Sequence, residues 1–405
     1  MATSPHNPRR RNSALLLTAL LASLLMLDYH SGTLTGHAGG SRGGCGGGSS
    51  GPATCSDISP CLEDYYCDKE THRCQPEPSP AALSDVTTIT GFRQEHISET
   101  KNYDKVVSFP TAELAYERVT GYMTLECPAS GCDPWDRFGK LVIAQPGSPP
   151  IQIARFVTPY NIETSGGPGS CDWAFDLTPY QSLLRGDVNL RLYIQTWAGK
   201  KKGYLISTRF TFHQGQPTRV PYKVVPLWES SHLLYGHPDH PPSDKLLTQS
   251  VEVDAHTTGA KVRVLVSGHG QGNTDNAAEF TKRWHKINAG SITDTWTPWR
   301  DDCAQNYCSP QGGNWKFNRA GWCPGDTITP HELDLTSTLN PETPLTIDYA
   351  IQPYTNHCRP DNPKCRATNR QHCMSFAREC SYNHNGHTTP HWKMASYLIL
   401  YKDVD

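Results

Sequence analysis

The sequence lacks a surplus of charge of either sign, and this argues against one broad class of function. Its 405 residues carry 37 Lys and Arg against 39 Asp and Glu, so the formal net charge is -2. A nucleic-acid-binding protein usually shows its basic face in this sum. We therefore expect no nucleic-acid partner.

Helical periodicity is also scarce. No segment longer than about 12 residues repeats its apolar side chains with the 3.6-residue period of an amphipathic helix. The nearest candidate is residues 277–287, AAEFTKRWHKI, which could equally be an active-site loop. The 33 Gly and 32 Pro residues punctuate the chain at short intervals, which is typical of turns between short strands.

Only one long hydrophobic run is present. Residues 14–27, ALLLTALLASLLML, follow the basic residues Arg9, Arg10 and Arg11. A membrane-spanning helix needs about 20 residues, so this run is short for a span. A basic start followed by a short apolar run is typical of a secretory signal peptide, with a signal anchor as the alternative. We expect residues 1–38 to be the signal peptide and its n-region, and the protein to be secreted or in the secretory-pathway lumen, with no membrane contact after signal cleavage.

Cysteine, in contrast, is abundant. Fifteen cysteines indicate an oxidising compartment. Four of them fall within 20 residues, after a Gly/Ser-rich linker at residues 39–53: Cys55, Cys61, Cys67 and Cys74. Their spacing lacks the short C-x2-C pairs that zinc prefers. We expect residues 54–76 to form a small disulfide-rich, EGF-like module.

The body of the chain, from residue 84 onward, contains many short segments that alternate apolar and polar residues. Residues 189–197 (NLRLYIQTW) and 261–268 (KVRVLVSG) are two examples, and this period of two predicts half-buried strands. Many such strands with long loops predict β-sandwich or jelly-roll layers. A Pro-rich passage near residues 215–245 divides the body, and we place the two domains at residues 84–218 and 219–405.

The most informative motif is CDPWDRF, residues 132–138, whose first residue closes a short loop between two cysteines. A disulfide between Cys127 and Cys132 would hold the following residues at a fixed angle. Partial burial by Trp135 would raise the pKa of Asp136, whereas the charge of Arg137 would lower it. The alternative is a surface loop with a local ion pair.

A second motif, GNWKFNRAGWCPGD, covers residues 313–326 and contains Arg319. Aromatic rings beside Arg and Asn suit a carbohydrate site, because ring faces stack on sugar C–H surfaces and planar donors bind hydroxyls. The alternative is a loop whose Trp side chains fill a core.

Five short segments occur in one order along the chain: CDPWDR, ARFVTPY (154–160), LYIQTW (192–197), AEFTKRWH (278–285) and RAGWCPG (319–325). Together they resemble the bacterial peptide-N-glycosidase F family, amidases that remove intact N-glycans from asparagine. The resemblance covers roughly residues 95–405. It implies an all-β fold of two consecutive jelly-roll-like β-sandwiches packed side by side, with the active site at their interface.

The resemblance also implies roles for individual residues. Asp136 matches the principal catalytic aspartate, which activates water, and Glu279 matches a second catalytic acid from the other domain. Four residues match groups that bind the substrate: Arg137, Arg319, Trp135 and Trp197. The substrates implied are N-glycosylated peptides or glycoproteins, and no metal or other cofactor is implied.

The chain departs from the family pattern at several positions. Gln195 stands where the family has a third catalytic carboxylate, and His269 replaces an aromatic residue of the substrate site. Ala277 and Thr281 replace two cysteines that bracket the second acid. Cys323 is expected to keep a disulfide, and the spacing favours Cys303 over Cys308 as its partner.

Two other functions remain open at this stage. Gln195 favours a catalytically weakened glycan- or glycopeptide-binding protein on the same scaffold. Three histidines in residues 384–391 (HNGHTTPH) suit a metal-dependent enzyme of the peptide monooxygenase kind. The absence of a His-His-Met motif and the presence of only five Met residues argue against the second alternative.

Overall fold

The computed structural model describes residues 65–68, 73–76, 86–111, 115–359, 361–362 and 389–404. The expected signal peptide, the linker and the histidines His384 and His387 lie outside this part of the chain. Of the expected cysteine-rich module, the structure describes β1 (Tyr65–Asp68) and β2 (Arg73–Pro76), which pair antiparallel. In the described ranges, no helix is long and apolar enough to cross a membrane.

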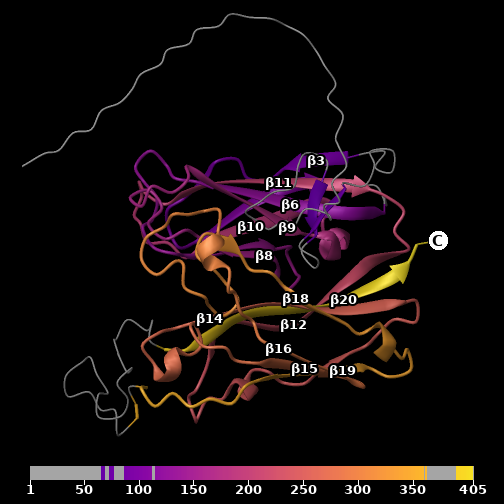
Figure 1. Ribbon diagram of the computed structural model, residues 1–405. Coiled ribbons are helices and arrows are strands. Elements are labelled where there is room, and N and C mark those ends of the chain that lie inside the picture. Colours follow the sequence, from indigo (N-terminus) through magenta and orange to yellow (C-terminus); the bar gives the residue numbers. More distant parts are fainter. Residues whose placement is uncertain are drawn as a thin grey trace, which may run out of the picture. The chain divides into compact units, whose positions relative to one another are not determined.

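The first β-sandwich is built from two five-stranded sheets (Figure 1). One sheet has the order β17-β8-β7-β10-β5, and the other has the order β3-β11-β6-β9, with β4 also paired to β11. Its strands are β3 (Val86–Thr90), β4 (Glu95–Ile97), β5 (Asn102–Phe109), β6 (Tyr116–Glu126), β7 (Phe138–Ile143), β8 (Ile151–Val157), β9 (Ser170–Asp176), β10 (Gly186–Ile194) and β11 (Tyr204–Gln214).

The second sandwich has two four-stranded sheets, ordered β12-β20-β14-β18 and β13-β19-β15-β16. Its strands are β12 (Arg219–Leu234), β13 (Gln249–Val251), β14 (Gly259–His269), β15 (His285–Ala289), β16 (Ile292–Trp296), β18 (His331–Asp334), β19 (Leu345–Ile351) and β20 (His391–Asp403). The short strand β17 (Asp326–Thr327) leaves this half of the chain and pairs with β8 of the first sandwich. The 3-10 helices are η2 (Thr178–Leu183), η3 (Pro242–Asp244), η4 (Thr274–Asn276), η5 (Cys303–Gln305) and η6 (Thr336–Thr338).

The alternating segments seen in the sequence form these strands. In β10 the side chains of Val188, Leu190, Leu192 and Ile194 are fully buried, while the residues between them are more exposed. This is the two-residue period of a strand with one face on a core. The predicted all-β fold with two consecutive sandwiches is confirmed.

Strand β20 belongs to both hydrophobic cores. Alternate residues, Trp392, Met394, Leu398 and Leu400, pack into the core of the second sandwich. The residues between them, Ala395, Tyr397 and Ile399, pack into the core that contains the first sandwich. Because side chains of a strand point to opposite faces in turn, one strand covers two cores.

Buried polar contacts also join the two sandwiches. The guanidinium of Arg155, on β8, donates through Nη1 to the carbonyl oxygens of Leu265 at 3.2 Å and Lys393 at 2.7 Å. The hydroxyl of Tyr397 accepts a 2.7 Å bond from the backbone N–H of Gln152. A disulfide between Cys171 and Cys308, described below, adds a covalent link.

Of the two alternatives for residues 277–287, the structure has the loop and not the helix: the segment is a turn and loop that runs into β15 at His285. The loop's backbone is held by other loops, since Ala320 N–H donates to the Glu279 carbonyl and Gln352 N–H donates to that of Trp284. These tertiary bonds override a weak helix propensity.

The Pro-rich passage at residues 215–245 lies between the last strand of the first sandwich, β11, and the body of the second sandwich. Much of it is the long strand β12, which lies at the edge of its sheet. The pairing of β12 with β20 shifts register after Pro221 and after Pro226. Proline has no N–H to donate, so it is tolerated at such edge positions and bulges.

Candidate active site

Asp136 lies in the loop between β6 and β7, and a rigid backbone frame fixes that loop. The disulfide between Cys127 and Cys132 closes its first part, with the two Cα atoms 4.7 Å apart. The N–H of Arg137 donates to Oγ1 of Thr158 at 2.7 Å, and the Thr158 N–H donates to the Arg137 carbonyl at 2.8 Å. These two bonds fix the backbone of Arg137, the residue directly after Asp136.

The ion pair of this loop involves Asp133 and not Asp136. The buried Asp133 carboxylate accepts two bonds from Arg137, from Nε at 2.6 Å and from Nη2 at 3.1 Å. It also accepts a 2.7 Å bond from the Thr196 hydroxyl. The Arg137 guanidinium lies over the ring of Trp197, 4.8 Å from its centroid. Sequence reasoning did not single out Asp133 for a role, although an acid four residues before the arginine was a signal.

Asp136 itself is partly buried, and its pKa is raised to about 6. Burial is the main cause, because it disfavours the charged carboxylate, and the negative charge of Asp133 raises the pKa further. The positive charges of Arg319 and Arg137 act in the opposite direction. Asp136 therefore titrates near the pH at which a general base is most useful.

Glu279 comes from the other half of the chain, in the loop between β14 and β15. Its side chain is 12% exposed, and its Oε2 accepts a 3.0 Å bond from the backbone N–H of Gly270. Burial raises the pKa of Glu279 to about 7, and the charge of Asp136 raises it further, while Arg319 opposes both. The structure therefore brings together two carboxyl groups that are 143 positions apart in the sequence (279 − 136).

Arg319 is the buried cation that both carboxylates share. It is fully buried, and its guanidinium lies over the rings of Phe280 at 5.1 Å and Trp322 at 4.7 Å. Its Nε donates to Oε1 of Glu279 at 3.4 Å. Its Nη2 donates to the side chain of Asn314 at 2.7 Å. The charge of Arg319 thus acts on two acids in a desolvated site. The pair of carboxyl groups therefore retains a proton to higher pH than exposed carboxyl groups do.

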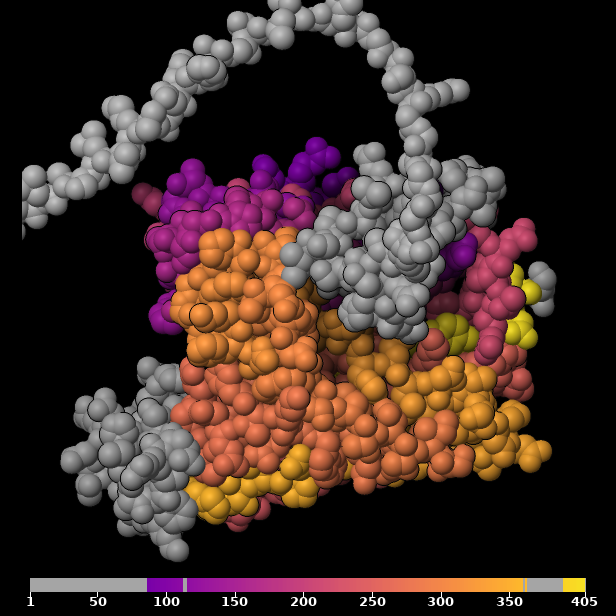
Figure 2. Space-filling view, in the orientation of Figure 1, coloured from indigo at the N-terminus to yellow at the C-terminus, as the bar shows by residue number. Residues whose placement is uncertain are grey.

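Two indole rings rim this group. Trp135 is 52% exposed and Trp197 is 63% exposed, which is unusual for such large apolar side chains. Trp135 packs edge-on against Tyr160, with ring centroids 5.5 Å apart. The loop that contains Arg319 lies against the same place, since Gly312 N–H donates to the Tyr160 carbonyl at 2.7 Å. In Figure 2 the orange surface of this second-sandwich loop accordingly lies against the purple surface of the first sandwich.

Gln195 and His269 have different positions relative to the acids. Gln195 follows the end of β10, where its N–H donates to the carbonyl of Phe138, close to Asp136 in the chain. His269 ends β14, and its ring stacks on Trp322 with centroids 5.1 Å apart. Burial and the neighbouring His391 hold the pKa of His269 well below its usual value, so the ring is neutral. His269 therefore supports the ring on which Arg319 lies.

The cysteines of the site form two disulfides besides the one near Asp136. Cys303 bonds to Cys323, with Cα atoms 5.2 Å apart, and closes the segment that contains Arg319. Cys308 bonds to Cys171 of β9, with Cα atoms 5.5 Å apart, and links the two sandwiches. The second pairing was not predicted, because so many cysteines allow many connectivities.

Residues with metal-ligand chemistry do not gather in the part of the chain that the structure describes. There, no group of three or more His, Cys, Asp or Glu side chains could hold a metal ion. His384 and His387 lie outside that part, so the expectation of a metal-free site stays a prediction.

The fold and this site define a class of protein. Two β-sandwiches meet at a pair of partly desolvated carboxyl groups, a buried arginine lies beside both, and exposed indoles form the rim. Such a site has a candidate base, a second acid and a stacking surface for a sugar.

Comparisons with known proteins show what the chain is similar to. The sequence model described as "Peptide-N-glycosidase F, C terminal" matches residues 238–399. The peptide-N(4)-(N-acetyl-β-D-glucosaminyl)asparagine amidase F of Elizabethkingia miricola is 28% identical over 261 residues, which are 62% of this chain and 72% of that protein. The family model covers most of the second sandwich, and both matches show that the chain is similar to proteins of the peptide-N-glycosidase F family.

Solved structures agree at the level of the fold. PNGase F, a glycosylasparaginase from Flavobacterium meningosepticum, superposes with a TM-score of 0.62 at 22% identity, covering 79% of this chain and 97% of that one. PNGF-II superposes with a TM-score of 0.57 at 17% identity, covering 80% of this chain and 66% of that one. The EGF-like assignment of residues 54–76 stays a prediction.

Proposed function

We propose that this protein is an amidase of the secretory pathway that hydrolyses the side-chain amide of glycosylated asparagine and releases the N-linked glycan. The observation that carries the proposal is the meeting of Asp136 and Glu279, from different sandwiches, around the buried Arg319. The name of the 28% identical relative describes this reaction. The exposed indoles beside Asp136 suit a sugar as part of the substrate.

Asp136 is the base in the proposed reaction. With a pKa of about 6 it is ionised at neutral pH, and it takes a proton from water as the water oxygen bonds to the side-chain carbonyl carbon. The carbonyl oxygen becomes an oxyanion, which donors of the site stabilise. When the tetrahedral intermediate collapses, the carbon–nitrogen bond breaks and the leaving nitrogen receives a proton. The products are an aspartate on the peptide and a glycosylamine, which then loses ammonia in water.

The two arginines have different parts in this scheme. Arg137 keeps 17% of its side chain exposed, and we assign it the direct contact with the substrate or the oxyanion. Arg319 has 1% of its side chain exposed, so it acts on the substrate through the two carboxyl groups. Glu279, whose pKa is about 7, holds a water molecule or the hydroxyls of the first sugars.

The test is hydrolysis in water enriched in heavy oxygen. The protein is incubated with a peptide that carries an N-glycan on asparagine, and the peptide product is analysed by mass spectrometry. We expect conversion of Asn to heavy-oxygen-labelled Asp. Asp136→Asn should reduce the rate by about 10²–10⁴-fold, the usual contribution of a general base, while the substrate still binds.

The matched control is Asp104→Asn, because Asp104 lies exposed on β5 and pairs with Arg191. It should leave the rate unchanged. Full activity in Asp136→Asn would refute the assigned base. Glycopeptide binding without any product would instead support the glycan-binding alternative, and recovery of product in Gln195→Glu would then identify the missing carboxylate as the cause.

A further inference from the structure

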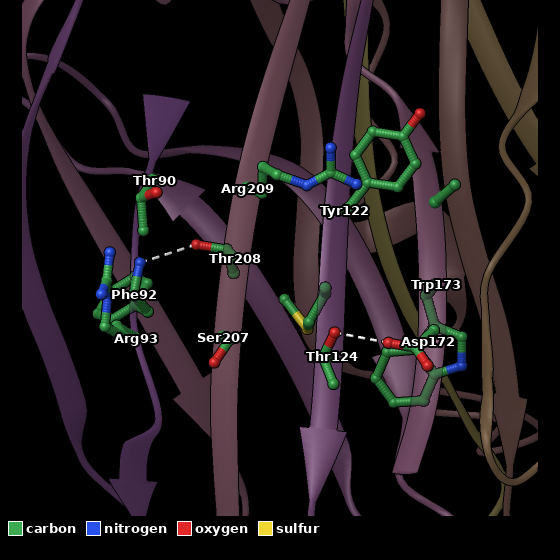
Figure 3. Close-up of a pocket in the computed structure, with 12 residues that line it drawn as sticks. Thr90, Phe92, Arg93, Tyr122, Thr124, Asp172, Trp173, Ser207, Thr208 and Arg209 are labelled. Carbon is green, nitrogen blue, oxygen red and sulfur yellow. Dashed lines mark hydrogen bonds between the residues drawn. The ribbon is translucent and has the colours of Figure 1, made fainter. Parts of the chain in front are cut away.

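A groove lies on the outer face of the sheet β3-β11-β6-β9 (Figure 3). Neither Asp136 nor Glu279 is among the residues that line it. Its volume is about 630 Å³, within the range of small-molecule sites. Met123 and Trp173 point into the core of the sandwich and are buried. Their strand neighbours point to the opposite face, so the groove is lined by side chains that packing of the core does not require.

Strand register arranges these side chains in two rows across the sheet. In the first row, Arg209 on β11 is opposite Tyr122 on β6, which is opposite Ala174 on β9. In the second row, Ser207 is opposite Thr124, which is opposite Asp172. The first row supplies an aromatic ring beside a small residue, and the second supplies hydroxyls and a carboxylate. Figure 3 labels Arg209 and Tyr122 of the first row and all three residues of the second row.

The ring of Tyr122 contacts a large side chain on one side and a small side chain on the other. The guanidinium of Arg209 lies over it, 4.3 Å from the ring centroid. On its other flank is Ala174, which is exposed and has only a methyl side chain. Space therefore remains beside the ring, above Ala174.

A carboxylate borders the same space. Asp172 precedes Ala174 by two residues on β9, so it lies on the same face, about 7 Å away along the strand. Its Oδ1 accepts a 2.5 Å bond from the Thr124 hydroxyl, which orients the carboxylate. An aromatic ring, a planar acceptor and hydroxyls around one cavity are the groups that recognise a sugar ring.

We propose that this groove is a second carbohydrate-binding site, which takes a neutral oligosaccharide such as the mannose-rich part of an N-glycan. The choice of ligand rests on the proposed function, whereas the groove's chemistry does not. Charges of both signs line the groove, Asp172 against Arg93 and Arg209, and the Arg209 guanidinium already lies over the Tyr122 ring. The hydroxyl-lined floor disfavours an apolar peptide.

The groove's position on β6 gives it a use in the proposed reaction. Thr124 precedes Cys127, the start of the disulfide-closed loop before Asp136, by three residues, or about 10 Å of strand. A glycoprotein held by one glycan at this groove presents its other glycans to the active site at a raised local concentration. The inferred benefit is for substrates with several or large glycans.

The experiment measures binding of a released oligomannose N-glycan, which has no bond that the enzyme can cleave. Isothermal titration is carried out on the wild-type protein, on Tyr122→Ala and on Ala174→Trp. Both variants should weaken binding at least tenfold, the first by removing the stacking ring and the second by filling the space beside it. The control is Thr88→Ala, an exposed change on β3 of the same sheet. Hydrolysis of a glycopeptide with only two sugars should stay unchanged in all three variants, which also shows that they are folded.

The outcomes separate this inference from the proposed function. Equal affinity in wild type and both groove variants overturns the groove site, whether or not the protein is an amidase. If the groove variants bind the glycan more weakly and the wild-type protein hydrolyses no glycopeptide, the groove site is supported and the amidase activity is refuted. Binding that is lost in Trp135→Ala and kept in Tyr122→Ala assigns the glycan to the active site and also overturns the groove.

Discussion

At the scale of single residues, Arg319 sets the charge state of the site. It is buried beside Asp136 and Glu279, and its charge favours ionisation of both acids. Burial works against it, and burial is the stronger effect for each carboxyl group. Both acids therefore titrate nearer to neutral pH than free carboxyl groups do, because burial outweighs the charges of Arg319 and, for Asp136, of Arg137.

This coupling predicts a pH dependence. Activity should rise as the pH increases through about 6, because Asp136 must lose its proton to act as a base. At the pH where Asp136 loses its proton, Glu279 is largely protonated and neutral, because its pKa is the higher of the two, at about 7. Glu279→Gln should therefore leave the rising limb of kcat/KM against pH near 6. A limb that moves by a full pH unit in Glu279→Gln would contradict this order of ionisation.

The raised pKa values also have a consequence for stability. In the folded protein the pKa of Asp136 is about 6 against an ordinary value of 3.8, so between these values the folded state binds more protons than the unfolded state. The free energy of unfolding must then fall as pH rises through this window. In Asp136→Asn the side chain carries no charge to desolvate, so the free energy of unfolding does not fall for this reason as the pH rises.

We expect Asp136→Asn to be more stable than the wild type at pH 8 by roughly 2–3 kcal/mol and to differ little at pH 4. Urea denaturation at both pH values measures the difference. Comparison with the variant cancels other titrating groups, such as the buried His269. A stabilisation that is the same at pH 4 and pH 8 would show that burial of the charge is not its cause.

At the scale of elements, the loop that contains Glu279 is positioned by its close approach to β14. A Cβ added at Gly268 would come within 2.4 Å of the carbonyl oxygen of Ala278, and Trp392 and Ala320 lie around the same point. Only a residue without a Cβ allows the loop backbone to come this near to the strand.

We therefore expect Gly268→Ala to displace Glu279 and to lower kcat at least tenfold, with a loss of stability of about 1–3 kcal/mol from overpacking. Gly169→Ala is the matched control, because a Cβ there meets nothing within 4 Å. Steady-state kinetics and thermal melting on both variants check this. Unchanged kinetics in Gly268→Ala would mean that the loop's placement against β14 does not matter for the reaction.

The sequence predicts elements where the local pattern decides them. The alternation in residues 189–197 corresponds to β10, which has one apolar face on the core. Residues 261–268 also form a strand, β14, but it is buried on both faces, including Arg263 and Ser267. The segment at residues 277–287 shows the opposite case. Its composition permits a helix, whereas bonds from Ala320 and Gln352, distant in sequence, hold it as a turn and loop.

The candidate site shows the same limit. The motif around Asp136 and the segment with Arg319 are visible in the sequence, but their meeting with Glu279 depends on how two sandwiches pack. The family resemblance placed these residues in one site, whereas composition and spacing alone did not. The pairing of Asp133 with Arg137 depends on side-chain direction within a turn, which spacing alone does not give.

At the scale of the whole molecule, the two sandwiches are one structural unit. They share β20, the bonds from Arg155 cross between them, and Cys171 is bonded to Cys308. Independent domains usually have polar interfaces and separate cores. Here the candidate active site lies where the two halves meet, so its geometry depends on this joint packing.

We expect a single cooperative unfolding transition by calorimetry. Ile287→Ala, in the second core, and Leu190→Ala, in the first, should both lower the temperature of that same transition, each costing about 2–5 kcal/mol. Tyr397→Ala, on the shared strand, should also shift the transition without splitting it. Two resolved transitions, each sensitive to one of the core variants, would show that the halves unfold separately.

The sharing of β20 also bears on the order in which the protein is made. Synthesis proceeds from the N-terminus, so β20 is the last strand of both cores to leave the ribosome. Until then Gly268 lacks its neighbour Trp392, and the first sandwich lacks Tyr397 over its core. A nascent chain can therefore contain Asp136, Glu279 and Arg319 and still be without a working site.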